Sequence, residues 1–169
     1  KLGKELAIES PVVKSDGERV DVIGVPDSAN TASLGFAHSN NKYNYPTRFE
    51  IGLIRNHYSG RTFISPKQDE RILKVKTKFN TVNGVIRNRH ITLVDDSIVR
   101  GTTSQALVQL IRRAGPKSID MRISSPPVKY PCHYGMDFPT REELIANHHS
   151  NVEEIRQKIA DSLKTTLTI

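Results

Sequence analysis

The sequence is short of cysteine, of long apolar runs and of repeats, and each shortage excludes a class of protein. Cys132 is the only cysteine among 169 residues, so no disulfide can form within the chain, which agrees with a reducing compartment. The longest apolar runs are far shorter than the roughly 20 residues that span a bilayer, and no charged-then-apolar leader opens the chain. We therefore expect a cytoplasmic protein with no membrane partner.

Disorder and low complexity are also disfavoured. Hydrophobic residues make up 36% of the chain and charged residues 25%, while glycine and proline are scattered rather than clustered. A length of 169 residues suits one domain, or one domain with a small appendage, and is enough to bury a sizeable core. The sequence therefore predicts a folded soluble protein.

Positive charge is concentrated in one stretch. Between residues 55 and 90 there are nine Lys or Arg residues against Asp69 and Glu70, which accounts for the whole net charge of +7. Such a stretch should meet an anion, with a solvated basic loop as the alternative. Nucleic acid is a less suitable partner, because the three aromatic residues interleaved with these charges are too few for a stacking platform.

Apolar periodicity predicts strands that alternate with helices. Strands are expected at residues 20–25, 49–54, 91–94 and 119–123, and helices at 2–9, 29–38, 102–114 and 152–159, with a capping box opening a short helix at Thr140. This alternation predicts an α/β fold with a mostly parallel twisted sheet and flanking helices on both faces. Residues 55–89 show no sustained period, which is typical of a functional or mobile loop.

Two adjacent carboxylates, Asp95 and Asp96, end the apolar strand at 91–94 abruptly. Burying them unpaired would be costly, so they should face water or a cation. Mg²⁺ takes oxygen ligands and is often shared between one or two carboxylates and substrate phosphates. In a parallel sheet the loops after Val25 and Val94 should face the same crevice, where ligands bind. The acid pair therefore predicts a site for Mg²⁺ and sugar hydroxyls.

A phosphate cradle follows the acid pair. Gly101 allows a tight turn, and Thr102, Thr103 and Ser104 begin a helix with hydroxyls and free N–H groups. Unsatisfied donors and the helix dipole both favour phosphate there, so the run predicts a ribose 5-phosphate site. The alternative is that the acids only end the strand and the hydroxyls only cap the helix, with no ligand. The close succession of strand, acid pair, glycine and hydroxyl residues disfavours this alternative. Neither a Walker lysine pattern nor a G-x-G-x-x-G turn is present.

The run from Val94 to Ser104, which reads VDDSIVRGTTS, resembles the phosphoribosyl pyrophosphate motif of the amidophosphoribosyltransferase family. Further blocks are similar to the family as well, namely 25–28 in its pyrophosphate-side loop, 60–64 in its flexible loop, and 122–127 with 130–132. The resemblance runs over residues 2–163, nearly the whole chain.

This resemblance implies a type I phosphoribosyltransferase fold. Residues 1–127 would form the core, with a flexible loop at about 55–89, and residues 128–169 would form a partial hood. The N-terminal glutaminase domain of the family is absent from these 169 residues, so we expect the chain to be the transferase part of a longer, homo-oligomeric protein.

The resemblance also implies roles for individual residues. Asp95 and Asp96 would be the catalytic pair that engages the ribose hydroxyls, and with Ser28 they would hold Mg²⁺. The substrate-binding residues would be Asp27, Ser28, Arg61, Lys78, Ser97, Arg100, Gly101, Thr102, Thr103 and Ser104. Of these, Arg61 and Lys78 are the expected pyrophosphate contacts, and pyrophosphate would give the basic stretch its partner.

The implied reaction is the attack of ammonia on the anomeric carbon of phosphoribosyl pyrophosphate. It gives 5-phosphoribosylamine and pyrophosphate, a pentosyltransferase reaction and the first step of purine synthesis. Positioning and electrostatics would supply most of the catalysis, and free ammonia scarcely needs a general base. Two alternatives remain, another type I phosphoribosyltransferase or a non-catalytic phosphoribosyl pyrophosphate sensor that binds nucleic acid.

Cys132 is similar in position to one of four cysteines that hold a [4Fe–4S] cluster in some members of the family. The other three cysteines are not among these 169 residues. We therefore expect a lone structural thiol in this chain, and a cluster only in a full-length form.

Overall fold

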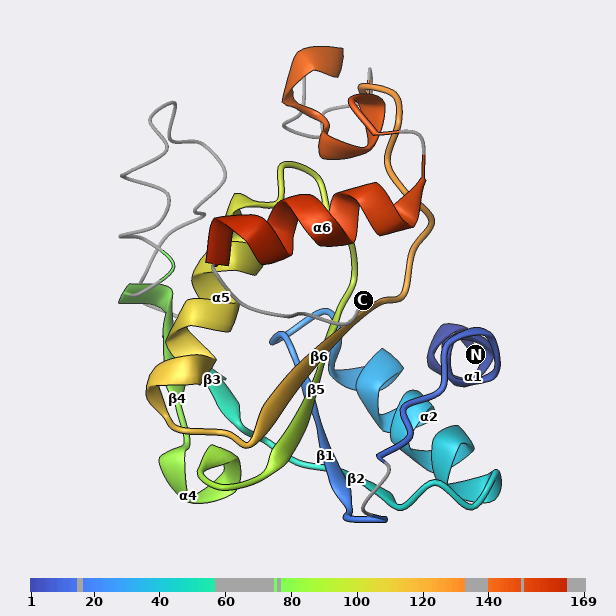
Figure 1. The fold of residues 1–169 in the computed structure, drawn as a ribbon, viewed down its shortest axis with the longest axis vertical. Coiled ribbons are helices and arrows are strands. Elements are labelled where there is room, and N and C mark those ends of the chain that lie inside the picture. The colour runs from blue at the N-terminus through green and yellow to red at the C-terminus, as the bar shows by residue number, and fades with distance from the viewer. Residues whose placement is uncertain (15–16, 57–74, 76, 133–139, 150, 164–169) are drawn as a thin grey trace.

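The computed structural model describes residues 1–14, 17–56, 75, 77–132, 140–149 and 151–163 (Figure 1). Its centre is a parallel sheet of β1 (Val20–Gly24), β2 (Thr47–Phe49), β5 (His90–Asp95) and β6 (Ser118–Ile123). The strands lie in the order β2-β1-β5-β6, and every neighbouring pair is parallel. The predicted α/β fold with a mainly parallel sheet is thereby confirmed.

The two central strands carry buried apolar residues on both faces, because each face is covered. Along β5, Ile91 and Leu93 pack into one hydrophobic cluster, whereas Val94 packs into the other. On β1, Val22 and Ile23 divide in the same way. Successive side chains of a strand point to opposite faces, so the continuous apolar run found in the sequence reflects two separate layers of core.

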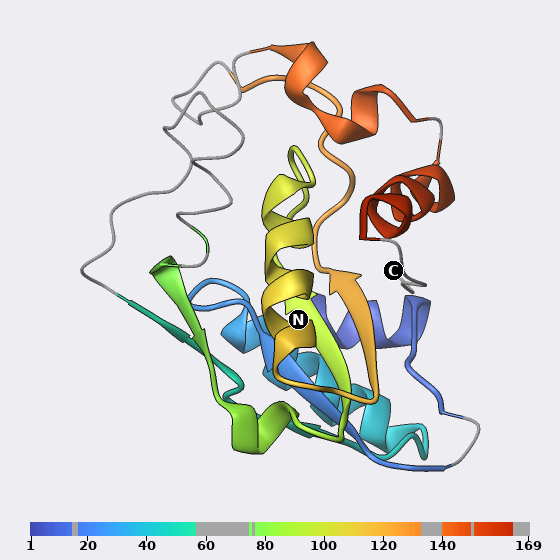
Figure 2. The same cartoon turned by 60° about the vertical axis from the view of Figure 1, so that its left-hand side comes forward.

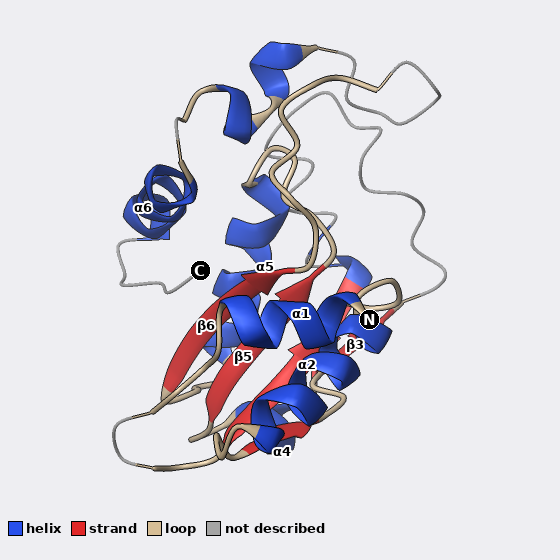
Figure 3. Ribbon diagram, turned by 90° about the vertical axis from the view of Figure 1, so that its right-hand side faces the viewer, coloured by secondary structure: helices blue, strands red, loops and turns tan. Residues whose placement is uncertain are grey.

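One face of the sheet is covered by α1 (Leu2–Glu9) and α2 (Asn30–Lys42), which lie in front of it in Figure 3. The two helices approach closely at Gly3, where an added Cβ would lie 1.8 Å from the carbonyl oxygen of Ala32. Only glycine permits this distance, so Gly3 fixes how α1 packs on α2.

The other face carries α5 (Thr102–Arg113) and, beside it, α6 (Val152–Leu163). Helix α5 buries Leu107 and Ile111 against the sheet, and α6 contributes Ile155 and Ile159 to the same cluster. The order of layers is therefore helices, sheet, helices. Among the described residues, no helix has the length and apolar character that crossing a membrane requires.

A short segment with two 3-10 turns, η2 (Arg141–Glu143) and η3 (Ile145–Asn147), lies beyond the carboxyl ends of the strands (Figure 2). We call residues 140–149 the cap segment. The predicted capping box at Thr140 is wrong in form, because Thr140 makes no side-chain cap hydrogen bond and a 3-10 turn follows it in place of an α-helix. The prediction of a partial hood over residues 128–169 stays a prediction.

The single strand predicted at residues 49–54 is wrong. The chain forms β2 in the main sheet, leaves it after Phe49, and forms β3 (Leu53–Arg55), which pairs antiparallel with β4 (Phe79–Thr81). Between them Gly52 lies against Ile23, so close that an added Cβ would be 2.2 Å from the Ile23 Cδ1 atom. One apolar run therefore serves two sheets, which periodicity alone does not reveal.

The stretch predicted to be irregular, residues 55–89, is only partly so. It contains β4 and the short helix α4 (Asn83–Ile86), which were not predicted because elements of three and four residues are too short to show a period. Most of the expected flexible loop, residues 57–74 and 76, lies outside the described residues. Helix α2 also runs to Lys42, beyond its predicted end at residue 38.

Candidate functional site

The acid pair lies where three loops leave the sheet side by side. Asp95 is the last residue of β5, and its carbonyl oxygen accepts a hydrogen bond of 3.0 Å from the N–H of Ser124, just after β6. On the other side the N–H of Val25, just after β1, donates to the carbonyl oxygen of Val94 at 2.9 Å. The loops that follow β1, β5 and β6 therefore begin together at the carboxyl edge of the sheet, as predicted for a ligand crevice.

The two carboxylates differ in their environment. Asp95 is buried, whereas Asp96 is exposed, and the N–H of Asp96 donates to Asp95 Oδ1 at 2.8 Å. Burial, reinforced by the negative charge of Asp96, raises the pKa of Asp95 to about 7. A buried carboxylate of this kind gains most from a cation, so the pair is suited to a divalent metal or to donor hydroxyls.

The turn into α5 has the geometry of an anion cradle. Gly101 adopts a left-handed conformation with φ of 78°, which a residue with a side chain rarely adopts, and it directly precedes α5. The first backbone N–H groups of this 12-residue helix have no intrahelical partner, no side chain caps them, and the first turn carries no acidic residue. Thr102, Thr103 and Ser104 supply hydroxyls at the same place, which suits phosphate.

A second group of charges lies around the loop after β1. Arg55, at the end of β3, forms an ion pair with Asp27, with 2.8 Å between Nη1 and Oδ2. Lys78 lies beside them, because the N–H of Asn56 donates to the Lys78 carbonyl oxygen at 2.7 Å. Burial and the charge of Arg55 lower the pKa of Lys78, which Asp27 partly offsets. Two cations held this close, with one carboxylate, are suited to a multiply charged anion.

Asp27 and Lys78 were predicted from the sequence as site residues, whereas Arg55 was not. Its position in the basic stretch was a signal, yet nothing local distinguished it from the other basic residues there. Only the pairing of β3 with β4, with Arg55 opposite Phe79, brings it next to Lys78.

The remaining predicted residues fall in different places. Ser28 is exposed on the loop after β1, and the Ser97 hydroxyl donates to Asp96 Oδ1 at 3.3 Å. Arg100 forms an ion pair with Glu143 of the cap segment. Arg61 lies outside the described residues, and Cys132 is half-buried and forms no disulfide. The site roles of all these residues stay predictions.

The described residues contain no cluster of three or more His, Cys, Asp or Glu side chains that would hold a metal by itself. Asp95 and Asp96 supply two carboxylates at one edge of the sheet. This donor set fits a hard cation such as Mg²⁺ that takes its other ligands from water and a substrate.

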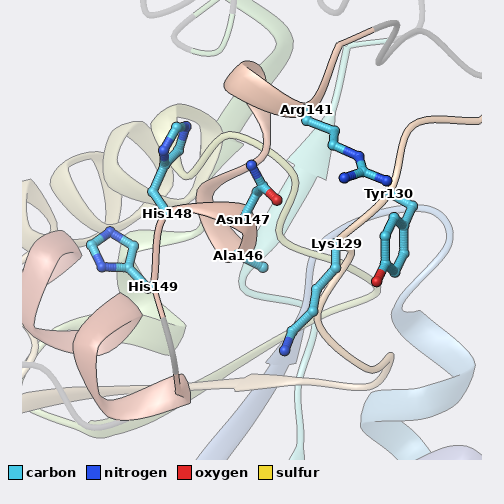
Figure 4. A pocket seen from close by; sticks show the side chains of 7 residues that line it. All are labelled: Lys129, Tyr130, Arg141, Ala146, Asn147, His148 and His149. Atoms are coloured by element: carbon cyan, nitrogen blue, oxygen red, sulfur yellow. The ribbon is translucent and has the colours of Figure 1, made fainter.

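Two cavities are found near the cap segment and α6, and neither includes the acid pair. One of about 270 Å³ is on the cap segment, with the guanidinium of Arg141 4.9 Å from the centre of the Tyr130 ring (Figure 4). Its lining consists of Lys129, Tyr130, Arg141, Ala146, Asn147, His148 and His149. The other, of about 510 Å³, lies between α1, the residues after β6 and the start of α6. Neither is lined by Asp95 or Asp96, so the candidate site is placed by the acid pair and the start of α5 at the carboxyl edge of the sheet, and not by a cavity.

Comparison with known proteins identifies relatives of nearly the whole chain. It is 49% identical over 163 residues to amidophosphoribosyltransferase of Bacillus subtilis, which covers 96% of this chain and 32% of the relative. It is 51% identical over 163 residues to Arabidopsis thaliana amidophosphoribosyltransferase 1, a chloroplastic protein, covering 96% and 27%. The chain thus spans between about a quarter and a third of the length of these relatives. No protein-family model matches the sequence.

A solved structure agrees with these relatives. Glutamine phosphoribosylpyrophosphate amidotransferase from B. subtilis, solved in complex with ADP and GMP, superposes with a TM-score of 0.73 at 43% identity. The match covers 99% of this chain and 34% of that one. The match therefore extends over nearly the whole chain.

Proposed function

We propose that this chain is the phosphoribosyltransferase part of an amidophosphoribosyltransferase. It matches about a third of the B. subtilis enzyme in sequence, and its fold is of the type I phosphoribosyltransferase kind. The observation that carries the proposal is the juxtaposition at the end of β5. There a carboxylate pair, a left-handed glycine and an uncapped helix N-terminus follow one another within ten residues of chain, 95–104.

The proposed reaction joins ammonia to the anomeric carbon of phosphoribosyl pyrophosphate. The bond from that carbon to the pyrophosphate oxygen breaks, a carbon–nitrogen bond forms, and the nitrogen loses a proton to solvent. The products are 5-phosphoribosylamine and pyrophosphate, the first step of de novo purine synthesis. Positive charge develops on the sugar ring and negative charge on the departing pyrophosphate, so the site has to stabilise both.

The two halves of the site divide this task. Asp95 and Asp96 would bind the ribose hydroxyls and stabilise charge on the ring, while the start of α5 holds the 5-phosphate through its N–H groups and hydroxyls. Mg²⁺, when bound at the acid pair, would supply positive charge to the pyrophosphate oxygens.

On the opposite side, Arg55 and Lys78 would receive the leaving group, which carries several negative charges. Ser28 and Asp27 on the loop after β1 would orient the pyrophosphate and the metal from that side. Arg61 is a further proposed contact, from the sequence alone.

The longer protein would add functions that this chain does not supply. We propose that a glutaminase domain delivers the ammonia, that the enzyme is a homo-oligomer, and that it acts in the cytoplasm. A [4Fe–4S] cluster at Cys132 would require three further ligands from elsewhere in that protein.

Calorimetry tests the proposal directly. Phosphoribosyl pyrophosphate should bind in the presence of Mg²⁺, and the double variant Asp95→Asn, Asp96→Asn should lose the metal-dependent affinity because both negative charges vanish. Asp161→Asn, on the exposed surface of α6, is the matched control. Undiminished metal-dependent binding by the double variant would refute the site.

Product analysis separates the alternatives. With phosphoribosyl pyrophosphate, Mg²⁺ and ammonia the protein should release pyrophosphate and form an amine product, whereas purine bases should not be consumed. Consumption of a base would identify another type I phosphoribosyltransferase. Binding without turnover, together with a gel shift on DNA at physiological salt, would identify a sensor instead.

A further inference from the structure

The cap segment contacts the loop between the acid pair and α5 from outside the sheet. Arg100 directs its Nε and an Nη toward the same carboxylate oxygen of Glu143, which is 43 residues away in sequence. One residue earlier, the carbonyl oxygen of Val99 accepts a hydrogen bond of 2.8 Å from the N–H of Ile145. One residue later, Gly101 lies so close to Ile145 that an added Cβ would be 2.9 Å from its Cδ1 atom. Three consecutive residues of the loop are thus held by one short segment.

These contacts act on the part of the loop that sets the phosphate cradle. Gly101 is the N-cap of α5, so its position fixes where the free N–H groups of the first turn point. The side chain of Arg100 is only 12% exposed and that of Glu143 is 36% exposed, so solvent screens this ion pair less than a fully exposed one. A shift of the loop by a fraction of an ångström would misplace donors that a phosphate needs at hydrogen-bond distance.

We propose that Glu143 is a positioning residue for the ribose 5-phosphate half of the site, acting through Arg100. The inference rests on the proposed function, since it assumes that the start of α5 binds a 5-phosphate. Glu143 itself would touch neither substrate nor metal. The pair also gives Arg100 a task other than direct substrate contact, because its Nε and an Nη face Glu143 of the cap segment.

A purely structural role for Glu143 would have a different signature. If the ion pair only held the cap segment to the core, its loss would lower stability and weaken every ligand alike. Positioning of the cradle predicts selective loss instead, because the pyrophosphate side is built on β3, β4 and the loop after β1, which Glu143 does not contact in any described interaction.

The test uses the two halves of the substrate as separate probes, ribose 5-phosphate and Mg²⁺ with inorganic pyrophosphate. In Glu143→Gln the affinity for ribose 5-phosphate should fall about tenfold, the order expected for one charge-assisted hydrogen bond. The affinity of the same variant for pyrophosphate should stay within about twofold of that of the unsubstituted protein. The pyrophosphate probe thus serves as the internal control for the ribose 5-phosphate probe. The matched control is Glu142→Gln, the adjacent carboxylate in η2, which should change neither.

A double-mutant cycle tells whether the effect passes through Arg100. If it does, Arg100→Gln should lower the affinity for ribose 5-phosphate to a similar extent. Adding Glu143→Gln to that variant should then lower the affinity little further. Additive losses would show that Glu143 acts by another route and would overturn the proposal. Equal weakening of both probes, or no weakening of ribose 5-phosphate, would overturn it as well.

The unsubstituted protein separates this inference from the proposed function. If it binds neither probe, the proposed function fails and the inference falls with it. If it binds both and Glu143→Gln binds ribose 5-phosphate equally well, only the inference is overturned.

Discussion

The two halves of the proposed site are built in different ways. The proposed ribose phosphate half is one continuous piece of chain, from Asp95 at the end of β5 to Ser104 in the first turn of α5. The proposed pyrophosphate half collects Asp27, Arg55 and Lys78 from three segments that meet because β3 pairs with β4 beside the loop after β1. A continuous motif can be recognised from its spacing, whereas an assembled one requires the fold.

The largest expected effect separates the two halves outright. The double variant Arg55→Gln, Lys78→Gln removes both cations. Its affinity for inorganic pyrophosphate in the presence of Mg²⁺ should fall about a hundredfold, because two charge-assisted contacts are lost, each worth roughly tenfold in affinity. Ribose 5-phosphate should bind as before. Calorimetry with both ligands measures this, with Lys158→Gln on α6 as the control. Comparable losses for both ligands would mean that the halves are not independent.

A backbone change should produce the next effect, on the opposite half. Gly101→Ala places a side chain at φ of 78° and at 2.9 Å from Ile145 Cδ1, which should cost about 1–2 kcal/mol of unfolding free energy and shift the start of α5. The affinity for ribose 5-phosphate should fall about tenfold, and the affinity for pyrophosphate should fall much less. Gly84→Ala, where the added Cβ meets nothing within 4 Å, should be nearly neutral. Denaturant unfolding and calorimetry give both values.

In the metal-free protein, the buried carboxylate of Asp95 should lower the free energy of unfolding at high pH. The pKa of Asp95 is about 7 when folded and near 3.8 when unfolded, so between these values unfolding releases a proton and stability falls as pH rises. Asp95→Asn cannot ionise and should be more stable than the unsubstituted protein at pH 8 by about 2–4 kcal/mol, with almost no difference at pH 4.

Thermal unfolding of Asp95→Asn in the presence of a chelator measures that difference. Asp161→Asn, which removes an exposed carboxylate, should show no such pH dependence. A variant that is less stable than the unsubstituted protein at pH 8 would mean that the carboxylate already has a compensating partner.

The smallest expected effect lies in the pyrophosphate half. The ion pair of Asp27 with Arg55 involves a carboxylate that is 55% exposed, so its loss should change stability by less than about 1 kcal/mol. Asp27→Asn would free Arg55 for an anion, and inorganic pyrophosphate without metal should bind up to about threefold more tightly. Weaker binding would show instead that Asp27 is needed to hold Arg55 in place.

Much of the fold was predictable because its signals are local. The apolar runs of β1, β5 and β6 and the one-sided pattern of α5 depend on neighbours within a few residues, and all these elements lie close to their predicted positions. Predictions failed where one apolar run is divided between two sheets, with Phe49 in β2 and Leu53 in β3. They also failed where an element is too short to show a period, as in β4.

The sequence by itself determined the proposed ribose phosphate half, since the carboxylates, the left-handed glycine and the helix start are set by residues next to one another. The tertiary structure alone decided that Arg55 meets Lys78 and that Glu143 meets Arg100. Those pairs are separated by 23 and 43 residues. Contacts over such separations depend on strand pairing and on the packing of the cap segment, which follow from how the whole chain buries its apolar surface and are not encoded in any local pattern.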